Sequence, residues 1–273
     1  MNWQELKSSE IGSLSRDTLV VVPMASIEQH GPHLPVGTDS YIAEGIVSAL
    51  DREFEGKLLI LPVQRLGCSG HHMEFPGTLT LQHQTFENVI LDVLDSMVRQ
   101  GFHRLLILNS HGGNQAIGGV IAEKAAYRWR DAQVVFTSWW RVAAERLRTL
   151  VEGAFPSVGH ACEFETSLML ALHPDLVNMK LAVDDGLPPR AKPLQHDLLS
   201  GAAATLAIPM HRLSRHGVYG RPTLAKAEKG CRILQETVAA LRDLIEACWP
   251  GLGISDVAPG FTSCGKIRVG MSS

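Results

Sequence analysis

The sequence lacks the features that mark secreted, membrane or disulfide-stabilised proteins. Its 273 residues include only five cysteines, an odd number with no C-x-x-C pair, which argues against a disulfide framework or a structural zinc knuckle. No apolar run approaches the length needed to span a bilayer. The first residues lack the basic and apolar regions of a signal peptide. We therefore expect a protein of the reducing cytoplasm, with no membrane partner.

Charge of either sign is also scarce. Charged residues make up 19% of the chain and the net charge is -3, so nothing in the composition favours nucleic acid or an anionic membrane as a partner. Hydrophobic residues make up 45%, which is ordinary for a globular protein with a sizeable core. The length fits one large α/β domain or two small ones.

What the chain does contain is an alternation of short apolar runs and helical patterns. The runs predict strands at 19–22, 58–63, 105–108 and 134–136, and the helical patterns fall at 41–54, 85–100, 115–130, 141–151, 165–172 and 223–249. This alternation predicts an α/β fold with a mostly parallel sheet covered on both faces. Residues 181–222 have weak periodicity and should be irregular. The last helix is expected to break near Gly230, and 251–273 to form a loose tail.

Potential metal ligands follow the first predicted strand. Glu28 and His30 are two residues apart in an extended segment, so their side chains can reach one point. Asp39 follows a Gly-Thr turn a few residues later. A lone Glu-x-His pair is common and usually binds nothing. Here, however, other strands lead into histidines, namely His71 with His72, and His111, and the carboxyl ends of parallel strands converge.

A further cluster, with His160, Glu163 and Glu165, opens a predicted helix. Acids in a first helical turn can be explained by the helix dipole alone, but that does not account for the Gly-His pair beside them. Carboxylates mixed with imidazoles suit Zn²⁺, Mn²⁺ or Fe²⁺ better than Mg²⁺ or Ca²⁺. Two such ions can activate a water and clamp a reacting group. Asp39 is our candidate for a carboxylate shared by both ions, slightly ahead of Glu28.

Several short motifs occur in order along the chain: Ile27-Glu28-Gln29-His30-Gly31, Gly37-Thr38-Asp39, Phe75-Pro76-Gly77-Thr78, Asn109-Ser110-His111-Gly112-Gly113-Asn114, His160 with Glu165-Thr166-Ser167, Gly217-Val218-Tyr219-Gly220 and Ala227-Glu228-Lys229-Gly230. Together they resemble the creatininase (creatinine amidohydrolase-like) family over about residues 2 to 248. Any one of these motifs is weak, whereas their order and joint presence are specific.

The resemblance implies a single three-layer α/β/α domain, here 1–250, that assembles into homo-oligomers, often hexamers. It implies metal-dependent hydrolysis of a carbon–nitrogen amide bond in a small molecule through a metal-activated water. By the same resemblance, Glu28, Asp39 and His111 would hold one divalent ion, and His30, Asp39 and a further carboxylate the second. Zinc is the expected metal, with manganese or iron as alternatives. His160 matches the family's proton-transferring histidine.

The sequence departs from the creatinine-hydrolysing pattern in two places. Those enzymes carry Tyr-Glu where this chain has Gly112-Gly113, and that acid is a metal ligand, so we expect Glu163 to complete the second site. They also place two tryptophans around the substrate, and only Trp140 has a counterpart here. We expect Trp140, His72 and Gly112 to bind substrate, and creatinine to be hydrolysed poorly. The rival hypotheses are a peptidase of a modified peptide, as in mycofactocin maturation, and a non-catalytic metal-containing binding protein.

Overall fold

The computed structural model describes residues 1–252. Within them, four strands form one sheet in the order β2-β1-β3-β4, and every neighbouring pair is parallel. The strands are β1 (Val20–Met24), β2 (Leu59–Ile60), β3 (Arg104–Asn109) and β4 (Gln133–Ser138). The predicted parallel α/β sheet is confirmed. The single domain at 1–250 stays a prediction, and the predicted tail lies, from residue 253 onward, outside the described residues.

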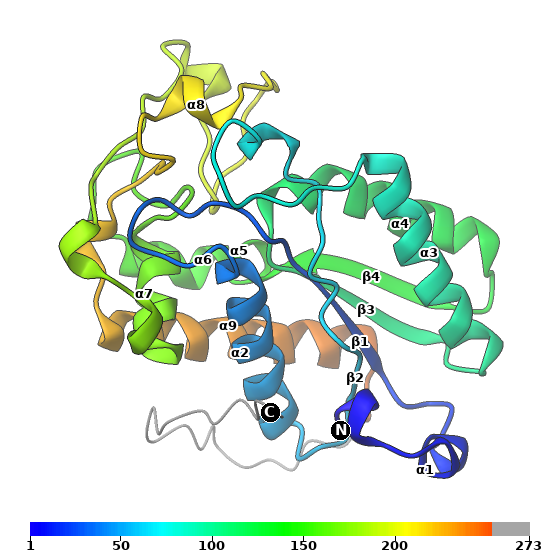
Figure 1. The fold of residues 1–273 in the computed structure, drawn as a ribbon. Helices are drawn as coiled ribbons and strands as arrows, with labels where there is room; N and C mark the ends of the chain where they lie inside the picture. Colours follow the sequence, from blue (N-terminus) through cyan, green and yellow to red (C-terminus); the bar gives the residue numbers. More distant parts are fainter. Residues whose placement is uncertain (253–273) are drawn as a thin grey trace.

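Helices cover both faces of this sheet (Figure 1). One face carries α3 (His83–Arg99) and α4 (Gln115–Arg128), and α1 (Ser8–Ser13) lies near the amino end of β1. The other carries α2 (Thr38–Glu53), α5 (Trp139–Val142), α6 (Ala144–Leu147), α7 (Glu163–Leu172) and α9 (Ala227–Cys248). The three layers are therefore α/β/α. None of the helices described is both long and apolar enough to cross a bilayer.

The alternation of side chains along each strand explains the two cores. Val20 and Val22 of β1 pack with Phe86 and Ile90 of α3 in one apolar cluster. Val21 belongs to the other cluster, which also contains residues of α2, α7 and α9. Successive strand residues point to opposite faces, so a continuous apolar run is what a strand buried on both faces requires.

Three predicted helices differ from those observed by more than a shift of two residues at an end. The helix α2 begins at Thr38 rather than residue 41, so Asp39 lies in its first turn. The predicted helix at 141–151 is divided into α5, α6 and a 3-10 turn, Arg148–Leu150. The predicted break near Gly230 was wrong, because α9 runs through it without interruption.

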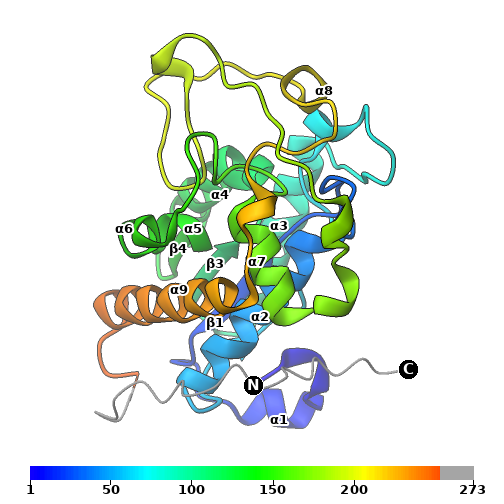
Figure 2. The same ribbon diagram turned by 90° about the vertical axis from the view of Figure 1, so that its left-hand side faces the viewer.

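The glycine at 230 serves packing between helices. A Cβ there would lie 1.9 Å from the backbone oxygen of Ser167 in α7, so only glycine lets α9 approach α7 this closely. In the segment 181–222, the described elements are the short helix α8 (Met210–Leu213) and 3-10 turns, as expected from its weak periodicity. This segment lies above the carboxyl ends of the strands (Figure 2).

The order of the strands positions the site. The chain passes from β1 to β2 on one side and then to β3 on the other. The carboxyl ends of β1 and β3 therefore flank the point at which the winding reverses, where open α/β sheets bind ligands. The loop after β1 carries Glu28 and His30, and the one after β3 carries His111.

Candidate metal centre

Asp39 lies between two histidines that come from different loops. Its Oδ1 atom is 3.2 Å from Nε2 of His30, and its Oδ2 atom is 3.0 Å from Nδ1 of His111. The Ser26 hydroxyl donates a hydrogen bond of 2.7 Å to Oδ2, which holds the carboxylate in this orientation. All three metal-ligand candidates are buried. One carboxylate thus presents a separate oxygen to each of two imidazoles.

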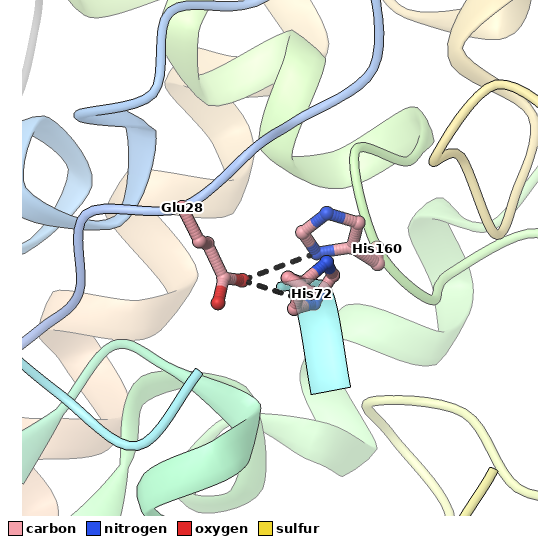
Figure 3. A group of neighbouring side chains, drawn as sticks. All are labelled: Glu28, His72 and His160. Carbon is pink, nitrogen blue, oxygen red and sulfur yellow. Dashed lines mark ion pairs between the residues drawn. The ribbon is translucent and has the colours of Figure 1, made fainter. Parts of the chain in front are cut away.

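Glu28 faces three imidazoles with a single oxygen. Its Oε1 atom lies 3.3 Å from Nδ1 of His111, 3.4 Å from Nε2 of His72 and 3.5 Å from Nδ1 of His160. Figure 3 shows His72 and His160 converging on this carboxylate from different elements. The second oxygen, Oε2, is buried and has no hydrogen-bond partner among the residues that the structure describes. Glu28 therefore retains unused ligand capacity.

Glu165 belongs to the cluster that opens α7, where the helix dipole alone could account for an acid. It lies in the first turn of α7, is 5% exposed, and leaves Oε2 without a hydrogen-bond partner in the described part of the chain. Its ligand atom groups with those of His30 and His160. The sequence does contain a signal for this residue, because residues 168–172 of the same helix are apolar on every side, which indicates a buried helix. A carboxylate buried there needs a partner.

Among residues 1–252 there are four groups of three side chains in which the ligand atoms of a group lie within 4.8 Å of one another, and each group shares a residue with another group. The groups are Glu28/His30/Asp39, His30/His160/Glu165, Glu28/His71/His111 and Glu28/His72/His160. The structure thus brings together five predicted residues from four stretches of the sequence: Glu28 and His30 after β1, Asp39 in α2, His111 after β3 and His160 before α7.

Glu163 lies outside these groups, and its carboxylate is engaged elsewhere. It accepts hydrogen bonds from Nζ of Lys229, the Ser157 hydroxyl and the backbone N–H groups of Glu152 (3.0 Å) and Gly153 (3.3 Å). Glu163 is fully buried and Lys229 is 6% exposed. Glu163, the carboxylate predicted to bind the second metal, is thus paired with Lys229 of α9.

The position that carries an acid in creatinine-hydrolysing enzymes is closed to any side chain. A Cβ at Gly113 would lie 2.1 Å from the carbonyl oxygen of Cys68 and 2.5 Å from Nε2 of His111. A Cβ at Gly112, in contrast, meets nothing within 4 Å. Of the other predicted substrate residues, His72 contacts Glu28, whereas Trp140 is 3% exposed and packs in the core.

Several carboxylates are buried close together in the cluster, and they shift the pKa values of Glu165 and His30. Burial and the neighbouring Asp39 and Glu28 carboxylates together raise the pKa of Glu165 to about 7, against the attraction of His30. Burial lowers the pKa of His30, but the carboxylates of Asp39, Glu165 and Glu28 together outweigh this and raise it to about 9. Neighbouring carboxylates contribute to both shifts, because carboxylates placed together away from water favour an added proton.

The donor set fits divalent metal ions. Four-coordinate zinc holds nitrogen and oxygen ligands at about 2.0–2.2 Å, which puts adjacent ligand atoms roughly 3.3 Å apart. The spacings around Asp39 and Glu28 run from 3.0 to 3.5 Å. Two buried carboxylate oxygens lack partners in the described structure, and a cation would provide one. Imidazole with carboxylate is also the chemistry that Zn²⁺ and Mn²⁺ accept.

The protein-family model described as "Creatininase: Creatinine amidohydrolase" matches residues 1–245 of this chain. The chain belongs to the creatininase family. The mycofactocin precursor peptide peptidase of Mycolicibacterium smegmatis is 31% identical over 85% of this chain and 86% of its own length. The 3-dehydro-scyllo-inosose hydrolase of Thermotoga maritima is 28% identical over 85% of this chain and 77% of its own.

Solved creatininases share the fold. A crystal structure of creatinine amidohydrolase superposes with a TM-score of 0.75 at 28% sequence identity, over 91% of this chain and 98% of that one. Other creatininase structures are described as a manganese form and, for one variant, as a Zn-Zn type. The family resemblance expected from the sequence is therefore confirmed. This chain is a hydrolase of the creatininase family with a cluster of candidate metal ligands.

Proposed function

We propose that this creatininase-family protein is an amidohydrolase that uses two divalent metal ions to cleave a carbon–nitrogen amide bond in a small molecule. The observation that carries the proposal is the Asp39 carboxylate, whose two oxygens face His30 and His111 separately, at 3.2 and 3.0 Å. A shared carboxylate of this kind is what a two-metal site needs.

The residues divide into two ligand sets around Asp39. Glu28 and His111 would complete one set. His30 and Glu165 would complete the other, with Glu165 rather than Glu163 as the further carboxylate, because Glu163 is bound to Lys229. When bound, the metals would supply an activated water and polarise the amide carbonyl.

The chain's own groups do the remaining work. Ser26 orients Asp39 through its hydrogen bond. His160 keeps Nδ1 directed at the cluster, 3.5 Å from Glu28 Oε1, where it can hold a proton and give it to the leaving nitrogen. Exclusion of bulk water by the buried cluster strengthens each of these electrostatic interactions.

Elemental analysis of single variants tests the two sets. The purified chain, saturated with Zn²⁺ and freed of excess, should contain two ions. Asp39→Ala should lose both and Glu165→Gln should lose one, whereas Glu87→Gln, a control at a buried acid of α3 outside the cluster, should keep two. Full zinc in Asp39→Ala would refute the shared carboxylate.

Turnover is tested with cyclic amides, formamides and a modified peptide in the presence of Zn²⁺ or Mn²⁺. His160→Ala should retain its metal and lower kcat by roughly 10²–10⁴. We expect creatinine to be a poor substrate, since the structure has only Trp140 at a predicted platform position and buries it. Metal binding with no hydrolysis across this panel would favour the binding-protein hypothesis.

A peptidase is the second candidate, and the open side of Gly112 favours it. A Cβ there meets nothing within 4 Å, so a substrate longer than a small ring has room beside His111. Cleavage of a modified peptide in preference to cyclic amides would select this candidate. From the resemblance we also infer a homo-oligomer, which light scattering on the purified chain would test, and from the cysteine usage a cytoplasmic location.

A further inference from the structure

The side chain of Gln29 lies between two histidines of the cluster, and backbone groups fix its orientation. Its Oε1 atom accepts a hydrogen bond of 3.0 Å from the N–H of Gly31, and its Nε2 atom donates one of 3.0 Å to the carbonyl of Gly217. An N–H can only donate and a carbonyl can only accept. The oxygen and nitrogen ends of this amide are therefore distinguished by partners of known polarity.

This orientation determines where His72 carries its proton. The Nδ1 atom of His72 is 2.7 Å from Gln29 Nε2, an amide nitrogen that can only donate. Nδ1 must accept, so a neutral His72 ring holds its proton on Nε2. That Nε2 atom is the one 3.4 Å from Glu28 Oε1. His72 thus offers Glu28 an N–H group rather than a lone pair.

His160 has the same protonated nitrogen but turns its other edge to the cluster. Its Nε2 atom is 2.8 Å from the backbone carbonyl oxygen of Gln29, so Nε2 carries the proton. The contact of 3.1 Å between His160 Nε2 and Gln29 Nε2 is then no hydrogen bond. The two amide hydrogens of Gln29 already go to Gly217 and His72. The Nδ1 lone pair of His160 is the atom that faces Glu28.

We infer that Gln29 is a positioning residue that gives the two histidines different roles, through its side-chain amide for His72 and its backbone carbonyl for His160. His72 presents its Nε2–H group to Glu28 and is not a metal ligand, whereas His160 presents a free Nδ1. Of the four candidate ligand groups, Glu28/His72/His160 is thereby excluded. The inference deepens the proposed function and rests on it only for the use made of His160.

NMR of the full chain labelled with ¹⁵N-histidine tests this assignment directly. Protonated and unprotonated ring nitrogens have well-separated ¹⁵N shifts, and His72→Gln and His160→Gln variants assign the signals. In the metal-free protein at neutral pH, both rings should show a protonated Nε2 and an unprotonated Nδ1. After loading with Zn²⁺, the His72 Nε2 proton should persist. A His72 proton on Nδ1, or its loss from Nε2 with zinc, would overturn the inference.

Substitution of Gln29 distinguishes the effect of its side-chain amide on His72 from the effect of its backbone carbonyl on His160. In Gln29→Glu the oxygen that faces Nδ1 of His72 can only accept, so the His72 proton should move to Nδ1. The His160 pattern should stay the same, because a backbone carbonyl sets it. In Gln29→Met, His72 should lose its single-tautomer pattern. The control is Gln100→Glu, which alters a glutamine that donates to the Ser96 carbonyl away from the site.

These outcomes are independent of turnover. An unchanged His72 pattern in both Gln29 variants would refute the role of the amide, and if neither variant folds, the wild-type spectrum decides alone. A protein that binds no zinc or hydrolyses no amide would refute the proposed function, but it would leave the tautomers of the metal-free chain as stated.

Discussion

Replacing Lys229 by methionine is expected to lower the free energy of unfolding by about 3 kcal/mol, because it leaves the buried Glu163 carboxylate without its cation. Glu163 of α7 is fully buried and Lys229 of α9 is 6% exposed. Methionine keeps most of the volume of the lysine stem, so packing between the two helices should change little. The loss therefore reports mainly on the charge.

The magnitude follows from what remains around the carboxylate. Removing one partner of a buried ion pair costs about 3–5 kcal/mol. Glu163 keeps hydrogen bonds from the Ser157 hydroxyl and from the N–H groups of Glu152 and Gly153, which places the cost at the lower end of that range. The second ion pair of Lys229, with Glu152 at 2.9 Å, contributes little because Glu152 is 44% exposed.

Urea unfolding of the metal-free protein at fixed concentration measures this loss as a change in midpoint at constant m. Glu163→Gln and the double variant Lys229→Met/Glu163→Gln complete a double-mutant cycle. The double variant carries neither charge, so it should be more stable than the sum of the single losses implies, by about 0.5–3 kcal/mol. A loss below roughly 1 kcal/mol for Lys229→Met, or strict additivity, would refute the buried pair.

Three further predictions concern other parts of the chain. Gly113→Ala should destabilise the protein by about 1–3 kcal/mol in thermal unfolding, because its Cβ would lie 2.1 Å from the Cys68 carbonyl, whereas Gly112→Ala, with open space, should be nearly neutral; equal effects would contradict the crowding. Gly230→Ala should be destabilising for the same reason against Ser167, while Gly119→Ala, in an open position of α4, should stabilise by about 0.5–1 kcal/mol. Partial burial raises the pKa of Asp185, but hydrogen bonds from Gly186 and His216 lower it to about 2, so its stabilising contribution is complete above its ordinary pKa and is lost as the pH falls towards 2. Asp185→Asn should therefore be less stable than the wild type at neutral pH and lose less stability on acidification, and identical acid profiles would contradict this assignment.

The parallel sheet could be predicted because its strands are buried on both faces and appear in the sequence as apolar runs. Boundaries that depend on a neighbouring element were not predictable in the same way. Gly230 indicates a break by local propensity, but its reason for being glycine is the backbone of α7 at Ser167. No local pattern in the sequence states which helix will lie against that position.

In the candidate site, too, the residues that follow strands could be predicted, whereas the choice between two neighbouring helix residues could not. Glu28, His30, Asp39 and His111 follow strands whose carboxyl ends must converge, and the structure brings them together. The two acids at the start of α7 were harder to separate. Residues two apart on a helix point about 200° away from each other, so only one of Glu163 and Glu165 can face the cluster. The sequence does not show how α7 is rotated about its axis.

The rotation of α7 links the buried pair to the metal centre. Lys229 binds Glu163 on the α9 side of the first turn, and this contact turns Glu165 towards His30 and His160. Glu28 and His111 lie on loops after β1 and β3 and do not depend on α7 in this way. Lys229→Met is therefore expected to weaken zinc binding at the set that contains Glu165 and to spare the other set. Titration of the folded variant against a zinc chelator should show one affinity lowered and one retained. Equal weakening of both sites would mean that the variant disturbs the whole fold, and two unchanged affinities would mean that the Lys229–Glu163 pair does not orient Glu165.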